Sequence, residues 1–237
     1  MGRVSLVTAL AIGSTLVMTS ETAAQERSRP GGSVRFSFVS GEPVGELALF
    51  FDHGFGAQLD AAWPMSSDGR VRLRADLGWL VYGHERLRYC YSVPIGCRIE
   101  EDVTTMNNIV YIGIGPEVGL PMGPLEPYAY GTTGLSYFAT VSSLGDGWGH
   151  ADWGETTNYS DLVIAFKLGG GIRLRVAPGT RPVSLDVGVE RHRNGIADFL
   201  TEGDIVDNPD GSITLYPNRS EADLTTFRFG LSVGVGG

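Results

Sequence analysis

Apolar and polar residues alternate with a period of two along several stretches of the chain. In the segment 71–83, odd positions such as Leu73 and Leu77 are mostly apolar, whereas even positions such as Arg72 and Asp76 include the charged residues. Successive side chains of a strand point to opposite faces, so this segment is predicted to be a β-strand with one apolar face. The same pattern recurs in 110–120, 162–176, 183–192 and 227–235, and less regularly in 34–39, 55–63 and 128–139. The chain is therefore predicted to form eight strands.

The connections between these strands alternate in length. Short turns rich in Gly, Pro and Asp cover 66–69, 121–127 and 177–182, and long polar stretches cover 41–54, 84–107, 141–160 and 194–224. Within the long stretches, 44–51 is expected to be a short helix or an extension of the first hairpin. A small hairpin is expected between 203–206 and 212–216, closed by a Pro-Asp-Gly turn. Alternating short and long connections are typical of an antiparallel up-and-down transmembrane β-barrel with its short turns on the periplasmic side and its long loops outside the cell.

The first 24 residues are expected to be a cleaved signal peptide, which leaves one domain of residues 25–237. Arg3 supplies a positive charge, 4–18 is almost wholly apolar, and 22–24 offers small residues for cleavage. An apolar run of about 15 residues is shorter than the roughly 20 that a membrane-spanning helix requires. No helical anchor is therefore expected in the mature chain.

The composition narrows the possible partners. The sequence has a net charge of −9, and 34 of its 237 residues are glycine. Nucleic acid is not an expected partner, because contacts to phosphate need clustered cations. Cys90 and Cys97 lie close together in a polar stretch, so they are expected to form one small disulfide loop in an exported protein. Two cysteines without nearby histidines make a poor zinc site, and neither a metal nor a cofactor is expected.

The polar face of the strands is predicted to line the barrel interior as a network. It carries many glycines and charges of both signs, namely Arg72, Arg74, Asp76, Glu117, Lys167, Arg173, Arg175, Asp186, Glu190 and Arg228, together with Arg35 and Asp60. An eight-stranded barrel is only wide enough for its side chains to fill, so mixed charges and glycines suit a packed, hydrogen-bonded lumen. The alternative is a soluble lipocalin-like barrel with its apolar face inward. The outer face of such a barrel is expected to carry more Lys, Glu, Ser and Thr, and fewer glycines.

Aromatic residues support a membrane-spanning barrel as a set. Six of them fall in or near predicted strand ends, where outer-membrane barrels carry interfacial belts: Trp63, Trp79, Tyr82, Tyr128, Tyr130 and Tyr137. For each one taken singly, packing inside the barrel is an equal alternative.

The leader, the eight strands, the alternating loops and the final segment 227–236, FRFGLSVGVG, resemble the small OmpA-like outer-membrane β-barrel proteins. The resemblance covers the mature chain and is one of pattern. It implies a monomer in the outer membrane, in contact with its lipids and lipopolysaccharide and inserted by the outer-membrane assembly machinery. The chain departs from many such proteins by ending on Gly236-Gly237 instead of an aromatic residue, and no peptidoglycan-binding domain is expected after the barrel.

Short motifs for catalysis or ligand binding fit poorly. The sequence GLSVG around Ser232 matches the nucleophile-elbow pattern but lacks a following helix and downstream Asp and His. Glycines at 113–115 and 169–171 lack the spacing of a dinucleotide-binding loop. Asn208 and Asp210 fit part of a calcium-loop pattern, but a turn is the better interpretation.

The segment 190–195, ERHRNG, is the strongest enzymatic candidate, because lipid A deacylases carry a similar His-x-Ser-Asn segment. Here Arg193 and Asn194 follow His192, so the serine nucleophile is missing. His192 is instead predicted to pair with Glu190 in the lumen or at its rim.

The sequence thus favours a non-catalytic integral outer-membrane protein with a structural or surface-interaction role. A lipid A-modifying enzyme, and a narrow channel or carrier for small hydrophobic molecules, remain the alternatives, since loop chemistry varies independently of the barrel.

Overall fold

The fold is known from a computed structural model, which describes residues 31–90, 100–145, 154–210 and 212–236. The predicted signal peptide lies outside these residues. So does the predicted disulfide, because neither Cys97 nor the side chain of Cys90 is among them.

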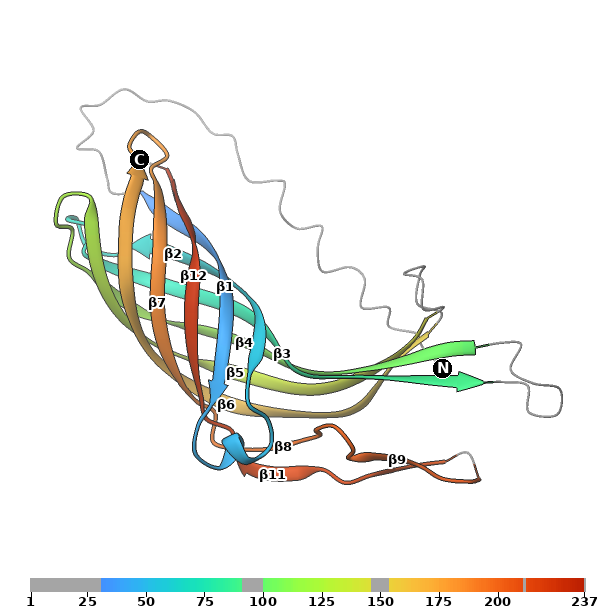
Figure 1. Cartoon of the computed structure of the whole chain (residues 1–237). Coiled ribbons are helices and arrows are strands. Elements are labelled where there is room, and N and C mark those ends of the chain that lie inside the picture. Colours follow the sequence, from blue (N-terminus) through green and yellow to red (C-terminus); the bar gives the residue numbers. More distant parts are fainter. Residues whose placement is uncertain (1–30, 91–99, 146–153, 211, 237) are drawn as a thin grey trace, which may run out of the picture.

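Eight antiparallel strands close into a barrel in the order β1-β12-β7-β6-β5-β4-β3-β2 (Figure 1). They are β1 (Gly32–Pro43), β2 (Gly54–Pro64), β3 (Val71–Cys90), β4 (Glu100–Gly119), β5 (Leu125–Gly145), β6 (Gly154–Ala177), β7 (Val183–Arg193) and β12 (Leu224–Val235). The first strand pairs with both β2 and the last strand, β12, so the sheet has no open edge within the barrel. This closure confirms the predicted eight-stranded architecture.

The connections form two different ends of the barrel. The turns 65–70, 120–124 and 178–182 share one rim with the last strand's end, and we call this rim the short-turn end (Figure 1, upper left). The opposite rim, the long-loop end, carries the 3-10 helix η2 (Gly45–Leu49) and four short strands. These strands are β8 (Ile196–Phe199), β9 (Ile205–Asp207), β10 (Ile213–Leu215) and β11 (Asn218–Glu221). The β9–β10 pair confirms the small hairpin expected from its Pro-Asp-Gly turn.

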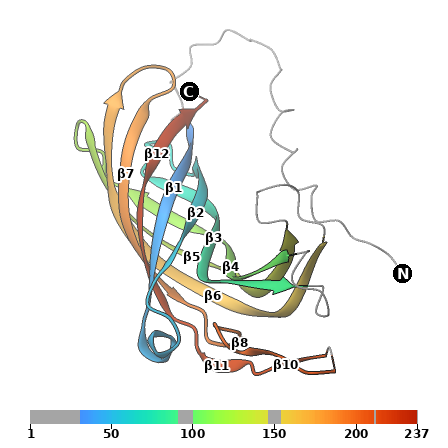
Figure 2. The same ribbon diagram turned by 45° about the vertical axis from the view of Figure 1, so that its right-hand side comes forward.

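Two predicted loops, 84–107 and 141–160, are in large part strand. β3 pairs with β2 only as far as Val81 but continues beside β4 to Cys90. Likewise, β6 runs beside β5 from Gly154 before it meets β7 at Phe166. We call this protruding part the extended sheet: it consists of β3 beyond Val81, β6 before Phe166, and the parts of β4 and β5 that pair with them. Figures 1 and 2 show it bending away from the barrel above the β8–β11 segment. The loop prediction was wrong because both faces of these stretches are largely polar, so no period of two separates apolar from polar positions.

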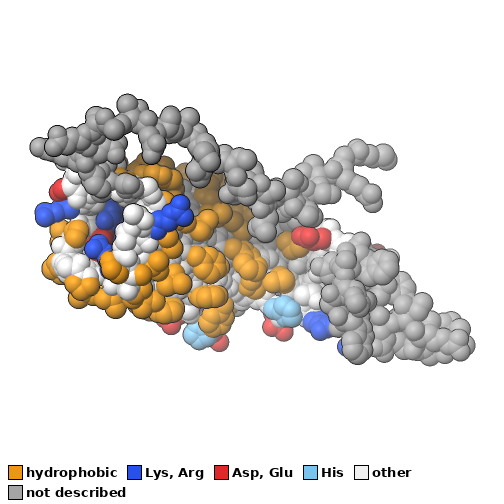
Figure 3. Space-filling model, turned by 90° about the horizontal axis from the view of Figure 1, so that it is seen from above, with side chains coloured by type: hydrophobic (Ala, Val, Ile, Leu, Met, Phe, Trp, Pro, Cys, Tyr) orange, Lys and Arg blue, Asp and Glu red, His pale blue; other side chains and the backbone are white. Residues whose placement is uncertain are grey.

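The polar face of every long strand turns inward. Arg35, Asp60, Arg74, Glu117 and Arg228 are buried. The apolar face covers the outside of the barrel (Figure 3), with residues such as Phe38, Leu77, Ile112, Phe166, Val187 and Phe229 exposed. A soluble barrel with an apolar interior is therefore excluded, because such a wide exposed apolar surface needs a bilayer to cover it.

The aromatic residues divide between the two faces. Trp63, Trp79 and Tyr137 are exposed on the outer surface, as predicted for a belt, whereas Tyr82, Tyr128 and Tyr130 are buried inside. For these three tyrosines the alternative of packing inside the barrel holds and the belt does not, because they share the alternation phase of the inward residues and find hydrogen-bond partners there.

Inward-facing glycines make room for the buried tyrosines. A Cβ added to Gly78 would lie 2.1 Å from Tyr111 Cζ, and one added to Gly169 would lie 2.4 Å from Tyr130 Oη. Each ring thus lies against its paired residue on the neighbouring strand, at a position without a side chain. This packing explains why the polar face is so rich in glycine.

Gly78→Ala is expected to lower the free energy of unfolding by about 1–3 kcal/mol, because the added methyl group forces Tyr111 off its position. Urea unfolding of the refolded barrel measures this loss. The matched control is Gly154→Ala in β6, where an added Cβ meets no atom within 4 Å. Equal effects of the two substitutions would contradict the proposed role of Gly78.

None of the helices in the described ranges has the length and apolar character that crossing a bilayer requires.

Candidate functional site

Glu117 of β4 is the centre of a buried ion-pair layer near the short-turn end. Its carboxylate lies 2.6 Å from Arg173 Nη2, 3.1 Å from Arg74 Nη1, 3.4 Å from Arg72 Nη1 and 3.5 Å from Arg35 Nη2. The four arginines come from β1, β3 and β6, so one carboxylate joins four strands across the lumen. Arg72 is the most exposed of these side chains, at 15%, and the other four are 5% exposed or less.

Two further carboxylates pair with arginines of this layer. Asp60 of β2 pairs with Arg74 and with Arg228, and Asp186 of β7 lies 3.3 Å from Arg35 Nε and 3.5 Å from Arg173 Nε. Paired buried charges of both signs avoid the large desolvation cost of an isolated ion. The layer therefore links strands on all sides of the barrel.

Tyrosine rings form flat surfaces for the arginines. The Arg74 guanidinium lies 3.8 Å from the centre of the Tyr130 ring, and that of Arg173 lies 4.1 Å from the centre of Tyr128. Tyr128 Oη also donates a hydrogen bond to Asp186 Oδ1 at 2.8 Å. Guanidinium groups stack well on aromatic faces, so the tyrosines and arginines pack against one another in the lumen.

A second group of charges lies towards the long-loop end. Lys167 of β6 pairs with Asp76 of β3, and Tyr130 Oη donates to Glu190 of β7. Glu190 Oε1 also lies 2.6 Å from His192 Nε2, which confirms the predicted pairing.

The structure brings together nine of the ten residues predicted for the lumenal network. Arg72, Arg74, Asp76, Glu117, Lys167, Arg173, Asp186, Glu190 and Arg228 contact one another or share partners. Arg175 does not join them: it is exposed at the short-turn end, next to a register shift between β6 and β7. Tyr128 and Tyr130 also belong to the network, although the sequence analysis considers them for the belt. They occupy even positions of β5, as do the polar residues Thr132 and Ser136, and this shared face could have indicated that they point inward.

The surroundings of His192 do not form a catalytic relay. In such a relay the acid binds one ring nitrogen and the nucleophile's hydroxyl binds the other. Here Glu190 Oε1 and Thr226 Oγ1 both lie at Nε2, at 2.6 and 3.3 Å, and Nδ1 has no hydrogen-bond partner. Asn194 is bound structurally, accepting from Ser136 Oγ and donating to the Ala222 carbonyl. This cluster positions strands and holds no acyl-transfer geometry.

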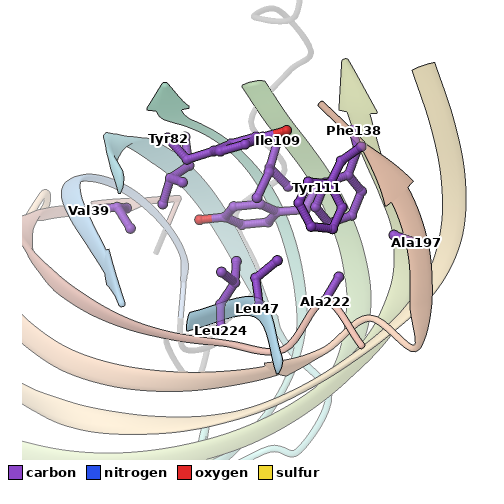
Figure 4. Packing of buried hydrophobic residues seen from close by; sticks show 11 residues of the cluster. Val39, Leu47, Tyr82, Ile109, Tyr111, Phe138, Ala197, Ala222 and Leu224 are labelled. Atoms are coloured by element: carbon purple, nitrogen blue, oxygen red, sulfur yellow. The ribbon is translucent and has the colours of Figure 1, made fainter. Parts of the chain in front are cut away.

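An apolar layer covers the charged groups at the long-loop end (Figure 4). Leu80, Ile109, Phe138 and Leu224 of the barrel strands are buried against one another. Leu47 of η2 and Ala197 and Phe199 of β8, which are not in the barrel strands, complete the layer. Because residues from two loops fill the barrel mouth, the lumen is closed by an apolar layer above an ion-paired one.

The closed lumen predicts the reactivity of Lys167, the sole lysine of the sequence, whose side chain has no solvent exposure. A water-soluble amine reagent is expected to leave Lys167 unmodified in the folded barrel and to modify it fully after heat unfolding. Peptide mass spectrometry reads this out, with the α-amino group of the chain as the reactive control in both states. Modification of Lys167 in the folded protein would show that water fills the lumen.

Polar and charged groups hold the extended sheet and the β8–β11 segment outside the barrel. Arg86 and Arg88 of β3 both donate to Asp102 of β4, and these hydrogen bonds lower the pKa of Asp102. The backbone N–H of Asp198 in β8 donates to Asp161 Oδ2 of β6 at 2.8 Å. The extended sheet and the β8–β11 segment are thus hydrogen-bonded structures and not free loops.

The described residues contain no group of three or more His, Cys, Asp or Glu side chains placed to hold a metal ion. In the partial calcium motif, Asp210 accepts hydrogen bonds from the backbone N–H and hydroxyl of Ser212, and Asn208 donates to Ser212 and Thr214. These contacts are those of a turn.

Comparison with solved structures gives the fold. The chain superposes on Neisserial surface protein A with a TM-score of 0.50 and 15% sequence identity, covering 86% of this chain and 97% of that one. Ail of Yersinia pestis gives a TM-score of 0.43 at 10% identity, covering 86% of this chain and 98% of that chain. A major outer membrane protein of Thermus thermophilus gives 0.41 at 14% identity, covering 84% and 98%.

No protein-family model matches the chain, and no curated protein matches its sequence. The closed barrel, its apolar outer wall and its superposition on Neisserial surface protein A agree with one another. The chain has the fold of the small eight-stranded outer-membrane β-barrel proteins.

Proposed function

We propose that this chain is a sealed, non-catalytic protein of the bacterial outer membrane that presents its extended sheet and β8–β11 segment for interactions at the cell surface. The observation that carries the proposal is the contrast between the two parts of the molecule. The lumen is filled by ion pairs and capped by apolar side chains, whereas four strands continue beyond the barrel as hydrogen-bonded structure. The proposal includes an export signal and insertion by the outer-membrane assembly machinery. It also includes a monomeric state in which the barrel contacts lipopolysaccharide and other lipids.

The two alternative functions fit the geometry less well. A channel or carrier needs open volume along the lumen, and the apolar layer around Leu47 and Phe199 fills the mouth. A lipid-cleaving enzyme needs its reactive group where lipid reaches it, which is the outer wall. His192, the residue that suggested such an activity, is buried inside and has no relay geometry.

Three measurements test the proposal, two on the refolded protein and one on intact cells. We expect no steady conductance in planar bilayers and no release of fatty acid from lipid A. We also expect that, in a background without Cys90 and Cys97, a membrane-impermeant thiol reagent labels Thr157→Cys in intact cells but labels Ser67→Cys only after the outer membrane is opened. Thr157 lies in the extended sheet and Ser67 in a short turn, and both are exposed. Conductance, hydrolysis or the reverse labelling pattern would each contradict the proposal.

A further inference from the structure

The short-turn end of the barrel carries exposed arginines although the whole chain is strongly acidic. Arg70 and Arg181 lie in short turns, and Arg175 lies at the adjacent end of β6; all three are exposed. Among the described residues of this end, Asp68 is the one exposed carboxylate, and it lies 3.5 Å from Arg70 Nε. Within the part of the chain that the structure describes, neither Arg175 nor Arg181 has an ion-pair partner. Figure 3 shows cationic side chains gathered at this end of the barrel.

The opposite end has the opposite charge. Exposed carboxylates predominate there, in Glu42, Glu46, Asp52, Glu155, Glu202, Asp207, Asp210 and Glu221. Arg86, Arg88, Arg193 and Arg219 are exposed at the long-loop end as well, but carboxylates outnumber them. The excess of positive charge is therefore confined to one rim and does not follow from the overall composition, which gives the chain a net charge of −9.

Apolar side chains surround these arginines at the same rim. Met65, Leu120, Met122 and Val176 are all more than half exposed, and Trp63 is 50% exposed. Residues of this kind at the tip of a short turn are stable where the turn sits at a membrane interface. The arginines beside them then lie at the depth of lipid phosphate groups, and cations at that depth are attracted to anionic headgroups.

We propose that Arg70, Arg175 and Arg181 bind the phosphate groups of anionic phospholipids in the periplasmic leaflet of the outer membrane. This inference rests on the proposed orientation of the barrel, with its short turns on the periplasmic side. Arg175 is the central residue of the proposal. Arg72 and Arg173 of the same end are paired with Glu126, at 2.6 and 2.8 Å, whereas the Arg175 guanidinium has no ion-pair partner among the described residues and can donate hydrogen bonds to a phosphate.

The test compares two triple variants of the whole mature protein refolded in mixed micelles. One is Arg70→Gln, Arg175→Gln and Arg181→Gln. The control removes three arginines from the long-loop end, as Arg191→Gln, Arg193→Gln and Arg219→Gln, and changes the net charge by the same amount. Native mass spectrometry then measures the binding of phosphatidylglycerol against phosphatidylcholine at equal mole fraction.

We expect the wild-type protein and the control variant to prefer phosphatidylglycerol, and each arginine removed from the short-turn end to weaken that preference by about fivefold. Added salt should reduce the preference in the wild type, since it screens exposed charges. An unchanged preference in the short-turn variant, or none in the wild type, would overturn the inference. So would arginine-dependent binding to insoluble peptidoglycan with no lipid preference. A wild-type protein that did not insert at all, shown by the absence of a heat-sensitive folded band, would instead refute the proposed function.

Discussion

Glu117→Gln is expected to destabilise the barrel by about 3–5 kcal/mol, because removing one member of a buried ion-pair group leaves the others uncompensated. The substitution keeps the size of the side chain and removes only its charge. Arg35, Arg72, Arg74 and Arg173 would then share the carboxylates that remain within the lumen. Urea titration of the refolded protein, followed by loss of the compact band on unheated gels, measures the change.

Two comparisons separate this electrostatic explanation from a general loss of packing. Asp102→Asn also removes a carboxylate that accepts from two arginines, but in the extended sheet, where the partners Arg86 and Arg88 are 46% and 64% exposed to water, so its effect should be much smaller. Combining Glu117→Gln with Arg35→Gln should recover part of the lost stability, because one fewer arginine is left uncompensated. A double variant that is simply the sum of two losses would argue against the ion-pair explanation.

The sequence predicts the barrel well where one face of a strand contacts lipid and the other contacts the lumen. The contrast between Leu77 and Asp76 in β3, or between Val187 and Asp186 in β7, is a direct consequence of those two environments. The inward direction of the charges follows from the same contrast, and so does the burial of Arg74, Glu117 and Arg228. Pairing between particular charges does not follow, because it depends on how eight strands are staggered.

The same reasoning explains what the sequence alone misses. The side chains of residues 84–88 are exposed or half-buried on both faces of the strand, so apolar and polar positions do not alternate there. Arg175 keeps the inward phase but lies at the rim, where the barrel ends and β6 changes register with β7. The layer that closes the lumen joins Leu47, Leu80 and Phe199, which are far apart in sequence. Local patterns cannot predict such an arrangement, because it is created by loops that fold back over the barrel mouth.

The outer wall leads to a second prediction of large effect. Leu77 is 50% exposed and lies in a row of outward apolar residues that crosses five neighbouring strands, paired in register as Leu59, Leu77, Ile112, Leu135 and Ile164. Leu77→Arg is expected to lower the stability of the inserted barrel by about 2–4 kcal/mol, because it places a charge against hydrocarbon near the middle of the bilayer. Unfolding from vesicles of defined lipid measures the loss.

Leu87→Arg is the matched control, because Leu87 is also on β3 and 43% exposed but lies in the extended sheet beyond the membrane. Its replacement should change stability little.

The accessibility of introduced thiols then decides which face of the strand contacts lipid. With Cys90 and Cys97 replaced, a thiol at Leu77→Cys should react with a lipid-soluble probe, and one at Asp76→Cys should not, since Asp76 is buried beside Lys167. Labelling of position 76 from the lipid, with position 77 protected, would mean that the polar face is the outer one and would overturn the membrane assignment itself.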